Sequence, residues 1–177
     1  MESFVYPDRV SILEIGDPQN TMVIDVEAGP NTNLGKYVQS KGGKYVALDI
    51  NSDFLKRREE EGNSEFPVLA DARSLPFASG PRDEVSKILA HVRFLLMNLP
   101  DDTDKERVIE EAFRVAGKDG TCLFIDYDWS SFKGGKVMEE FGKLCKEVLQ
   151  RMGVNIYFGS QSKEFIEGVM KEMGISG

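Results

Sequence analysis

The fold is indicated first by one short stretch, residues 23–31, which reads VIDVEAGPN. It continues a nearly uninterrupted apolar run at 21–26, as expected for a parallel strand that is covered on both faces. A glycine-containing turn follows, and a helix-like segment begins after it. This order of strand, turn and helix is typical of loops that bind a nucleotide cofactor. Glu27 stands where such loops usually have their first glycine, which raises the question of whether the loop still holds a cofactor.

The rest of the chain alternates between strand-like and helix-like periods. Apolar runs predict further strands at 44–50, 66–71, 84–92 and 121–129. Spacings of three and four predict helices at 33–43, 53–62, 103–120, 134–152 and 162–174, with Thr103 and Ser162 as caps of the third and the last. A helical turn is expected at 94–99 and a brief extended piece at 155–158. Strand and helix alternating in this way predict an α/β fold, with a parallel sheet of about five strands flanked by helices and a helical C-terminal extension.

Length and composition predict one soluble domain over residues 1–177. Hydrophobic residues make up 41% and charged residues 29%, which are ordinary values for a globular protein. The formal charge of −8 argues against a nucleic-acid partner, because such a partner calls for a basic surface. The basic run at 56–58 is followed at once by three glutamates, so we interpret it as a solvated helix face.

Residues for metal or disulfide sites are few. Cys122 and Cys145 form no CxxC pair and His91 is the sole histidine, so neither a disulfide framework nor a metal site is predicted. The first ten residues lack the basic and apolar regions of a signal peptide, and no window is apolar enough to span a membrane. We therefore expect a cytoplasmic protein without a membrane segment.

Acidic residues end three successive predicted strands, namely Asp25, Asp49 and Asp71. In such sheets ligands bind beyond the carboxyl ends of the strands, at the point where the strand order reverses. Carboxylates there can accept hydrogen bonds from the hydroxyls and amines of a nucleoside. They can equally be solvated caps, or acids stabilised by a helix dipole, and spacing alone leaves both interpretations open. His91 and residues 126–128 follow the later strands at the same edge.

These residues carry a family resemblance. The segment VIDVEAGPNTNLGKYV resembles the first motif, hhD-x-G-x-G-x-x-T-x-x-L, of class I, Rossmann-like S-adenosyl-L-methionine-dependent methyltransferases, particularly the small-molecule type 11 group. Asp25, Gly29, Thr32 and Leu34 take the matching places, with Thr32 one position off the commonest register. The resemblance runs from about residue 7 to residue 127. It implies a Rossmann-like fold and S-adenosyl-L-methionine (SAM) as the cofactor.

The later motifs of the family also have counterparts. YVALDINSDFL resembles the second motif, in which the acid, here Asp49 with Ile50 beside it, would hold the ribose hydroxyls. PVLADARSLPF resembles the third, in which Asp71 and the backbone of Ala72 would face the adenine. KILAHVRFLLMNLPD and IEEAFRVAGKDGTCLFIDY resemble the fourth strand, its short helix and the turn into strand five, which brings His91 to the cofactor edge.

The chain departs from the family pattern in two respects. Glu27 replaces the glycine that lets the backbone approach the methionine part of the cofactor; its carboxylate could pair with the cofactor's amino group or sulfonium, or repel its carboxylate. Asn31 replaces a further glycine but tolerates left-handed dihedrals. The usual final β-hairpin has no counterpart before Gly177: either it is absent, or the sequence is a fragment, or residues 155–158 substitute for part of it. Strand five would then keep an exposed edge, and forming a homo-oligomer is one way to cover it.

The NAD-binding alternative is weaker. The pattern G-x-G-x-x-G would fall on Glu27, Gly29 and Thr32, so a single glycine of three is kept. Asp25 before the loop and the run LADARSLPF also favour the methyltransferase side.

The resemblance implies a SAM-dependent methyltransferase that acts on a small-molecule acceptor. Methyl transfer is an in-line displacement, so it needs a base only when the acceptor must lose a proton. His91 and Tyr127 are the candidate catalytic residues, although a packed histidine without a catalytic role is the alternative for His91. Residues 1–129 would form the cofactor-binding core, and residues 130–177, with Phe132 near their start, a helical lid. The competing hypothesis is a non-catalytic methyltransferase-like domain that binds a partner, which Glu27 and the short C-terminal part favour.

Overall fold

The computed structural model describes residues 18–61, 66–80, 87–129 and 134–175. The first ten residues, Gly62 and Phe132 lie outside these ranges, so what the sequence indicates for them stays a prediction.

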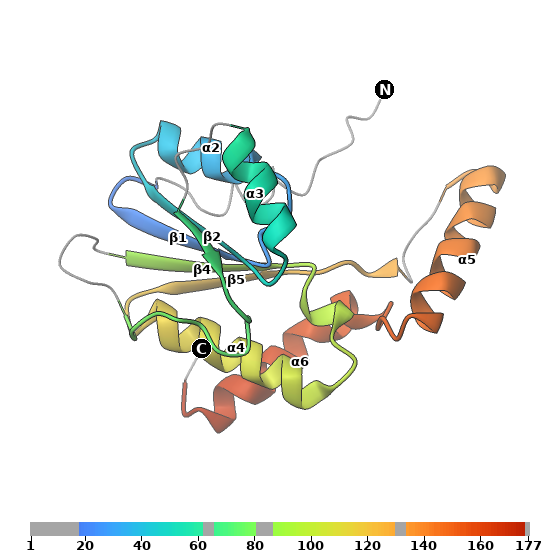
Figure 1. Ribbon diagram of the computed structural model, residues 1–177. Coiled ribbons are helices and arrows are strands. Elements are labelled where there is room, and N and C mark those ends of the chain that lie inside the picture. Colours follow the sequence, from blue (N-terminus) through green and yellow to red (C-terminus); the bar gives the residue numbers. More distant parts are fainter. Residues whose placement is uncertain (1–17, 62–65, 81–86, 130–133, 176–177) are drawn as a thin grey trace.

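Five parallel strands form the sheet of the described residues. Their bounds are β1 (Thr21–Val26), β2 (Lys44–Asp49), β3 (Phe66–Leu69), β4 (Lys87–Arg93) and β5 (Thr121–Ile125). The strand order is β3-β2-β1-β4-β5, so β1 is central and the order reverses between β1 and β4 (Figure 1). That reversal is where a ligand is expected at the carboxyl edge. The predicted α/β fold with about five parallel strands is confirmed.

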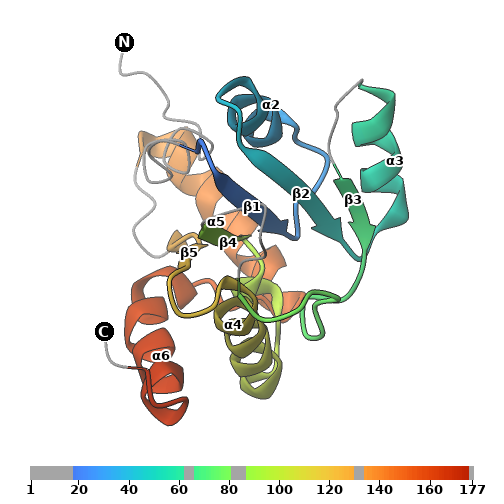
Figure 2. The same cartoon turned by 90° about the vertical axis from the view of Figure 1, so that its left-hand side faces the viewer.

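Helices cover both faces of this sheet. α2 (Asn33–Ser40) and α3 (Ser52–Glu60) lie on one face, and α4 (Asp102–Ala116) and α6 (Phe158–Glu172) lie on the other (Figures 1 and 2). α5 (Lys136–Arg151) projects from the body, and η1 (Leu96–Asn98) is the helical turn expected after the fourth strand (Figure 1). No helix in the described parts of the chain is both long and apolar enough to cross a membrane.

Alternation along the strands decides which side chains lie under which helices. In β1, Ile24 and Val26 belong to the apolar cluster that includes the buried face of α4, whereas Val23 belongs to the cluster with α2 and α3. Asp25 has the same parity as Val23, and the strand register places it beside His91 of β4. A group of polar side chains is therefore buried on the α3 side of the sheet.

Two helix starts differ from the predictions. α4 is capped by Asp101, whose carboxylate accepts a hydrogen bond from the amide of Thr103 at 2.9 Å, so the predicted cap at Thr103 is wrong. α6 begins at Phe158, so Ser162 is not its cap. The segment expected to be extended at 155–158 instead forms a turn, which the amide of Asn155 ties to the carbonyl of Met97 at 2.9 Å.

The interpretation of the basic run at 56–58 is wrong for one residue. Lys56 and Arg57 are exposed, but Arg58 is only 1% exposed. It lies three residues after Leu55, which is also buried, and side chains at this spacing share one face of a helix. Arg58 therefore belongs to the buried side of α3.

Candidate functional site

The loop after β1 has a left-handed backbone at two positions, Glu27 with φ +61° and Gly29 with φ +60°. Glycine adopts this conformation freely, whereas another L-residue there costs about 1–2 kcal/mol. Two hydrogen bonds fix the loop to the end of β2: the amide of Ala28 donates to the carbonyl of Leu48, and the amide of Gly29 donates to Oδ2 of Asp49, both at 2.9 Å. The turn of a cofactor loop is thus formed although its first glycine is absent.

Asp49 is fully buried and uses both of its carboxylate oxygens. Oδ2 accepts from Gly29, and Oδ1 accepts from the amide of Asn51 at 2.8 Å. Because an ionised carboxylate offers about four lone-pair positions, acceptor capacity remains on both oxygens. The next residue, Ile50, is 60% exposed, so an apolar side chain lies beside the acid at the sheet edge.

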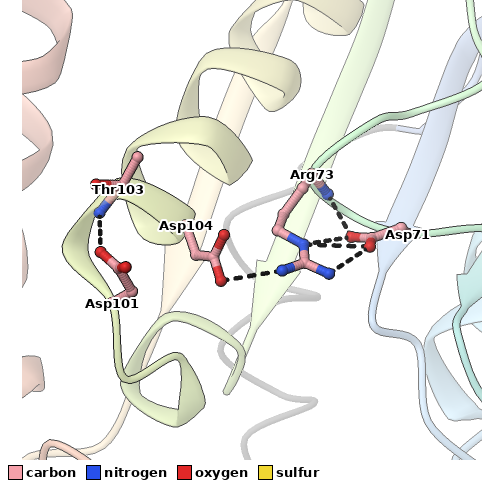
Figure 3. A network of polar contacts seen from close by, with 5 residues as sticks. All are labelled: Asp71, Arg73, Asp101, Thr103 and Asp104. Carbon is pink, nitrogen blue, oxygen red and sulfur yellow. Dashed lines mark hydrogen bonds and ion pairs between the residues drawn. The ribbon is translucent and has the colours of Figure 1, made fainter.

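Asp71 follows β3 and is held by Arg73, whose Nε and Nη2 donate to its carboxylate (Figure 3). The same guanidinium donates from Nη1 to Asp104 of α4 at 3.0 Å. The hydrogen bond from Arg73 lowers the pKa of Asp71, so this carboxyl is ionised at neutral pH. Ala72, between the two, is buried. Arg73 therefore links the third strand end to α4 and neutralises part of the acid's charge.

Glu27, Asp49 and Asp71 form one electrostatic group at the carboxyl edge, which we call the acid cluster. Burial raises the pKa of Glu27, and the charges of Asp49 and Asp71 raise it further. Glu27 follows β1, Asp49 ends β2 and Asp71 follows β3, so the three carboxyls belong to adjoining strand ends. The acid cluster is therefore an electronegative spot beside the switch point, suited to a ligand that carries positive charge.

Asp25 and His91 lie deeper, inside the protein. The side chain of His91 is completely buried, and its Nδ1 lies 2.6 Å from Oδ1 of Asp25. Oδ2 of Asp25 accepts a hydrogen bond from the hydroxyl of Tyr45, which in turn accepts from Nη2 of Arg58 at 3.0 Å. Burial alone would raise the pKa of Asp25, but the charge and hydrogen bonds of its neighbours, His91 foremost, lower it overall. In this conformation neither Asp25 nor His91 reaches the surface where a cofactor or acceptor would bind.

Aromatic side chains gather where β4 and β5 end. Phe94, which has φ +57°, stacks on Tyr127 with ring centres 4.3 Å apart, and Trp129 meets Tyr127 edge-on at 6.1 Å. The guanidinium of Arg93 lies 5.3 Å from the centre of the Phe94 ring. Tyr127 is 45% exposed, so part of this aromatic group is open to solvent.

Asp126 lies between β5 and this aromatic group. Burial raises its pKa to about 7, partly offset by hydrogen bonds from the amides of Met97 and Leu96. Its Oδ1 is buried and has no hydrogen-bond partner among the described residues. A carboxyl with these properties can exchange a proton near neutral pH.

The structure thus separates the predicted site residues into two sets. Asp25 and His91 pair inside the protein. Glu27, Gly29, Asp49 and Asp71 lie at the carboxyl edge, and Ile50 and Ala72 follow the strand-end acids directly. Asn31 lies on the outer part of the loop, where its Oδ1 accepts from the amide of Asn33 at 2.9 Å.

Sequence reasoning missed two arginines that contact site residues. Arg58 could have been found from its helical spacing to Leu55. The contact of Arg73 with Asp71 lies within two residues, but its link to Asp104, 31 residues later, has no comparable signal.

The chain matches the model of a family described as "Methyltransferase domain" over residues 24–124. No curated protein sequence matches it significantly. Similar solved structures include a protein of Bacillus halodurans assigned to the methyltransferases (TM-score 0.66, 20% identity, covering 93% of this chain and 68% of that one). A SAM-dependent methyltransferase from Aquifex aeolicus gives TM-score 0.57 and 20% identity over 84% of this chain and 79% of that one.

An S-adenosylmethionine-dependent methyltransferase from Clostridium acetobutylicum gives TM-score 0.56 and 14% identity over 69% of this chain, but the match covers only 50% of the Clostridium protein. At these identities the structural likenesses show the fold. The family match begins in β1 and ends in β5, and it therefore includes every strand of the sheet. Because that match spans more than half of the chain, this protein belongs to the methyltransferase domain family.

Proposed function

We propose that the chain transfers the methyl group of SAM to a small-molecule acceptor. Membership of the family implies SAM as the cofactor and methyl transfer as the general reaction. One observation supports a working site in this chain. The acid cluster lies at the adjoining carboxyl ends of β1, β2 and β3, next to the switch point between β1 and β4, where a ligand of an α/β fold is expected.

The residues present fit the charge and shape of this cofactor. SAM carries a sulfonium and an ammonium group, which complement the three carboxylates of the acid cluster. A Cβ placed on Gly29 would meet no atom within 4 Å, so the loop backbone is open there to a ligand. The exposed side chain of Ile50 offers an apolar surface for the adenine, and the buried Asp49 beside it holds the loop in place through the amide of Gly29.

Each part of the site would have a separate task. Bound SAM supplies an electrophilic methyl group. The acid cluster would orient its cationic end, and the exposed ring of Tyr127 would hold the acceptor against the end of β5. Asp126, with its raised pKa, would take up a proton from an acceptor that must lose one. His91 would act from inside by holding Asp25, since its ring does not reach the surface.

A non-catalytic binding module is the second candidate function. It is favoured because Asp49 and Asp71 already have partners within the chain. It is also favoured by α5, which leaves Val137, Phe141 and Leu144 more than half exposed. Such a surface suits a partner better than it suits water.

Isothermal titration with SAM and S-adenosylhomocysteine, with NAD as a control ligand, tests the proposal. We expect SAM and S-adenosylhomocysteine to bind at micromolar concentrations and NAD not to bind. For the substitution Glu27→Gln, the matched control is Glu59→Gln, because this glutamate is exposed on α3. Folded protein that gives no heat with SAM would contradict the proposal and favour the binding module. A screen of small acceptors for release of S-adenosylhomocysteine then tests turnover.

A further inference from the structure

Arg58 is a buried cation whose partners are mostly backbone oxygens of the loop after β1. Its Nη1 donates to the carbonyls of Ala28 at 3.2 Å, of Gly29 at 3.0 Å and of Asn31. Its Nη2 donates to the hydroxyl of Tyr45, whose ring centre lies 5.6 Å from the guanidinium carbon. The guanidinium thus gathers three carbonyls of a single turn, which fixes the direction of the peptide groups in that turn.

This arrangement replaces a property that the loop sequence lacks. Two places at which a glycine would confer freedom hold Glu27 and Asn31 instead, and Glu27 is left-handed. An outside contact that favours one backbone conformation can offset such strain. A charged donor does this more strongly than a neutral one, because hydrogen bonds to ionised groups are shorter and stronger.

The charge of Arg58 is compensated inside the sheet. The hydroxyl of Tyr45 donates to Asp25, and Asp25 pairs with His91. The chain of contacts therefore runs from α3 through β2 and β1 to β4, on both sides of the strand reversal. Removing one partner of a buried charged network leaves the others uncompensated, so the network holds the loop rigidly with respect to the strands.

We propose that Arg58 is a positioning residue of the cofactor site, which holds the loop at 27–31 in the form that receives SAM in place of the missing glycines. The inference rests on the proposed function for its ligand, but the loop geometry that it invokes exists without ligand. Arg58 touches backbone oxygens, and it acts on the cofactor through the position of the loop.

The test compares Arg58→Lys with Arg57→Lys, a neighbouring arginine whose side chain is 67% exposed. Lysine keeps the positive charge but cannot reproduce the planar fork that reaches several carbonyls at once. Two quantities are measured well below the melting temperature: the dissociation constant for SAM, and hydrogen exchange of the amides at 27–32 in the ligand-free protein. We expect Arg58→Lys to weaken SAM binding about tenfold or more, the equivalent of at least one charged hydrogen bond, and to speed exchange at Gly29. Arg57→Lys should change neither.

Unchanged affinity and unchanged exchange in folded Arg58→Lys would overturn the inference, whatever its melting temperature. If that variant does not fold, Tyr45→Phe decides, since it removes the link between Arg58 and Asp25 but keeps the ring. Faster loop exchange and weaker SAM binding in Tyr45→Phe would support the inference, and wild-type values would overturn it. If the wild-type protein binds no SAM but Arg58→Lys still speeds exchange of the loop amides, the proposed function is refuted. The positioning of the loop by Arg58 is then still supported.

Discussion

Gly29 and Asp49 are joined across the carboxyl edge of the sheet, because the Gly29 amide donates to the Asp49 carboxylate at 2.9 Å. The acid at the end of β2 is fully buried, and it helps to build the loop after β1 beside the predicted ligand position. A change at Asp49 would therefore alter the shape of the loop next to whatever binds there.

Glu27→Gln tests whether the charge at position 27 selects the cofactor. The substitution keeps the shape of the side chain and removes one carboxylate from the acid cluster. SAM should bind about five- to tenfold more weakly, equivalent to roughly 1 kcal/mol of lost attraction, because its sulfonium loses a partner. S-adenosylhomocysteine has a neutral sulfur and should lose less. Titration of both ligands measures the difference, and equal losses would show that the charge does not discriminate.

Glu27→Gly separates backbone strain from charge. Glycine accepts φ +61° without cost, so the free energy of unfolding should rise by roughly 1 kcal/mol. Urea unfolding measures this change, with Ala28→Gly as the contrasting substitution at a position that has no left-handed backbone. If SAM binds only after Glu27→Gly, the natural loop was defective. If wild-type binding falls, Glu27 is a ligand of the cofactor.

Arg73→Gln should strengthen the binding of SAM. The substitution removes the cation that pairs with Asp71, so the acid cluster becomes more negative. We expect an affinity gain of about two- to fivefold at low salt, shrinking as salt screens the charges. The melting temperature should change little, since the side chains of Arg73 and Asp71 are 44% and 37% exposed and such ion pairs contribute little to stability. Lys118→Gln, on an exposed residue, controls for net charge. Weaker binding would mean that Arg73 itself contacts the cofactor.

Asp126→Asn should make stability less dependent on pH. The folded protein holds the proton of Asp126 up to about pH 7, whereas the carboxyl of an unfolded chain loses it near pH 4. The stability that this group contributes is therefore complete below pH 4 and is lost as pH rises to about 7. The neutral amide keeps that contribution, so the variant should be more stable than wild type at pH 8 by roughly 2 to 4 kcal/mol.

Urea unfolding at pH 5 and pH 8 checks this expectation, with Asp119→Asn on an exposed turn as control. A variant that is destabilised equally at both pH values would show that Asp126 is ionised in the folded protein throughout this range.

Phe141→Glu tests the exposed stripe of α5. Because this side chain is 55% exposed, the change in the free energy of unfolding should stay within about 0.5 kcal/mol. Binding of an apolar dye and concentration-dependent association should both fall, because the contiguous apolar surface is interrupted. Lys143→Gln, on the same helix, makes the matched change of net charge by −1 at an exposed residue. A clear loss of stability would show that α5 packs against the body in solution.

The sequence predicted the sheet well, because buried parallel strands read as apolar runs and the helices between them keep a regular spacing. It also predicted that acids would meet at the strand ends, since parallel strands share one edge. It did not predict how those acids are occupied. Arg73 links Asp71 to Asp104, which comes 31 residues later, and Arg58 reaches the loop from a helix 29 residues after Gly29. No local pattern encodes such contacts. His91 lies at the end of the correct strand, but the parity of its position turns it inward toward Asp25.

The central place of β1 also sets the order in which the chain can be completed. The strand on one edge of β1, β2, ends at Asp49, whereas its other edge must wait for β4, which begins at Lys87. Until then Asp25 lacks its partner 66 positions later, and a carboxylate in a half-built core is costly to bury. Synthesis at about 5–20 residues per second leaves this interval at several seconds. Closure of the core around Asp25 therefore follows the arrival of β4.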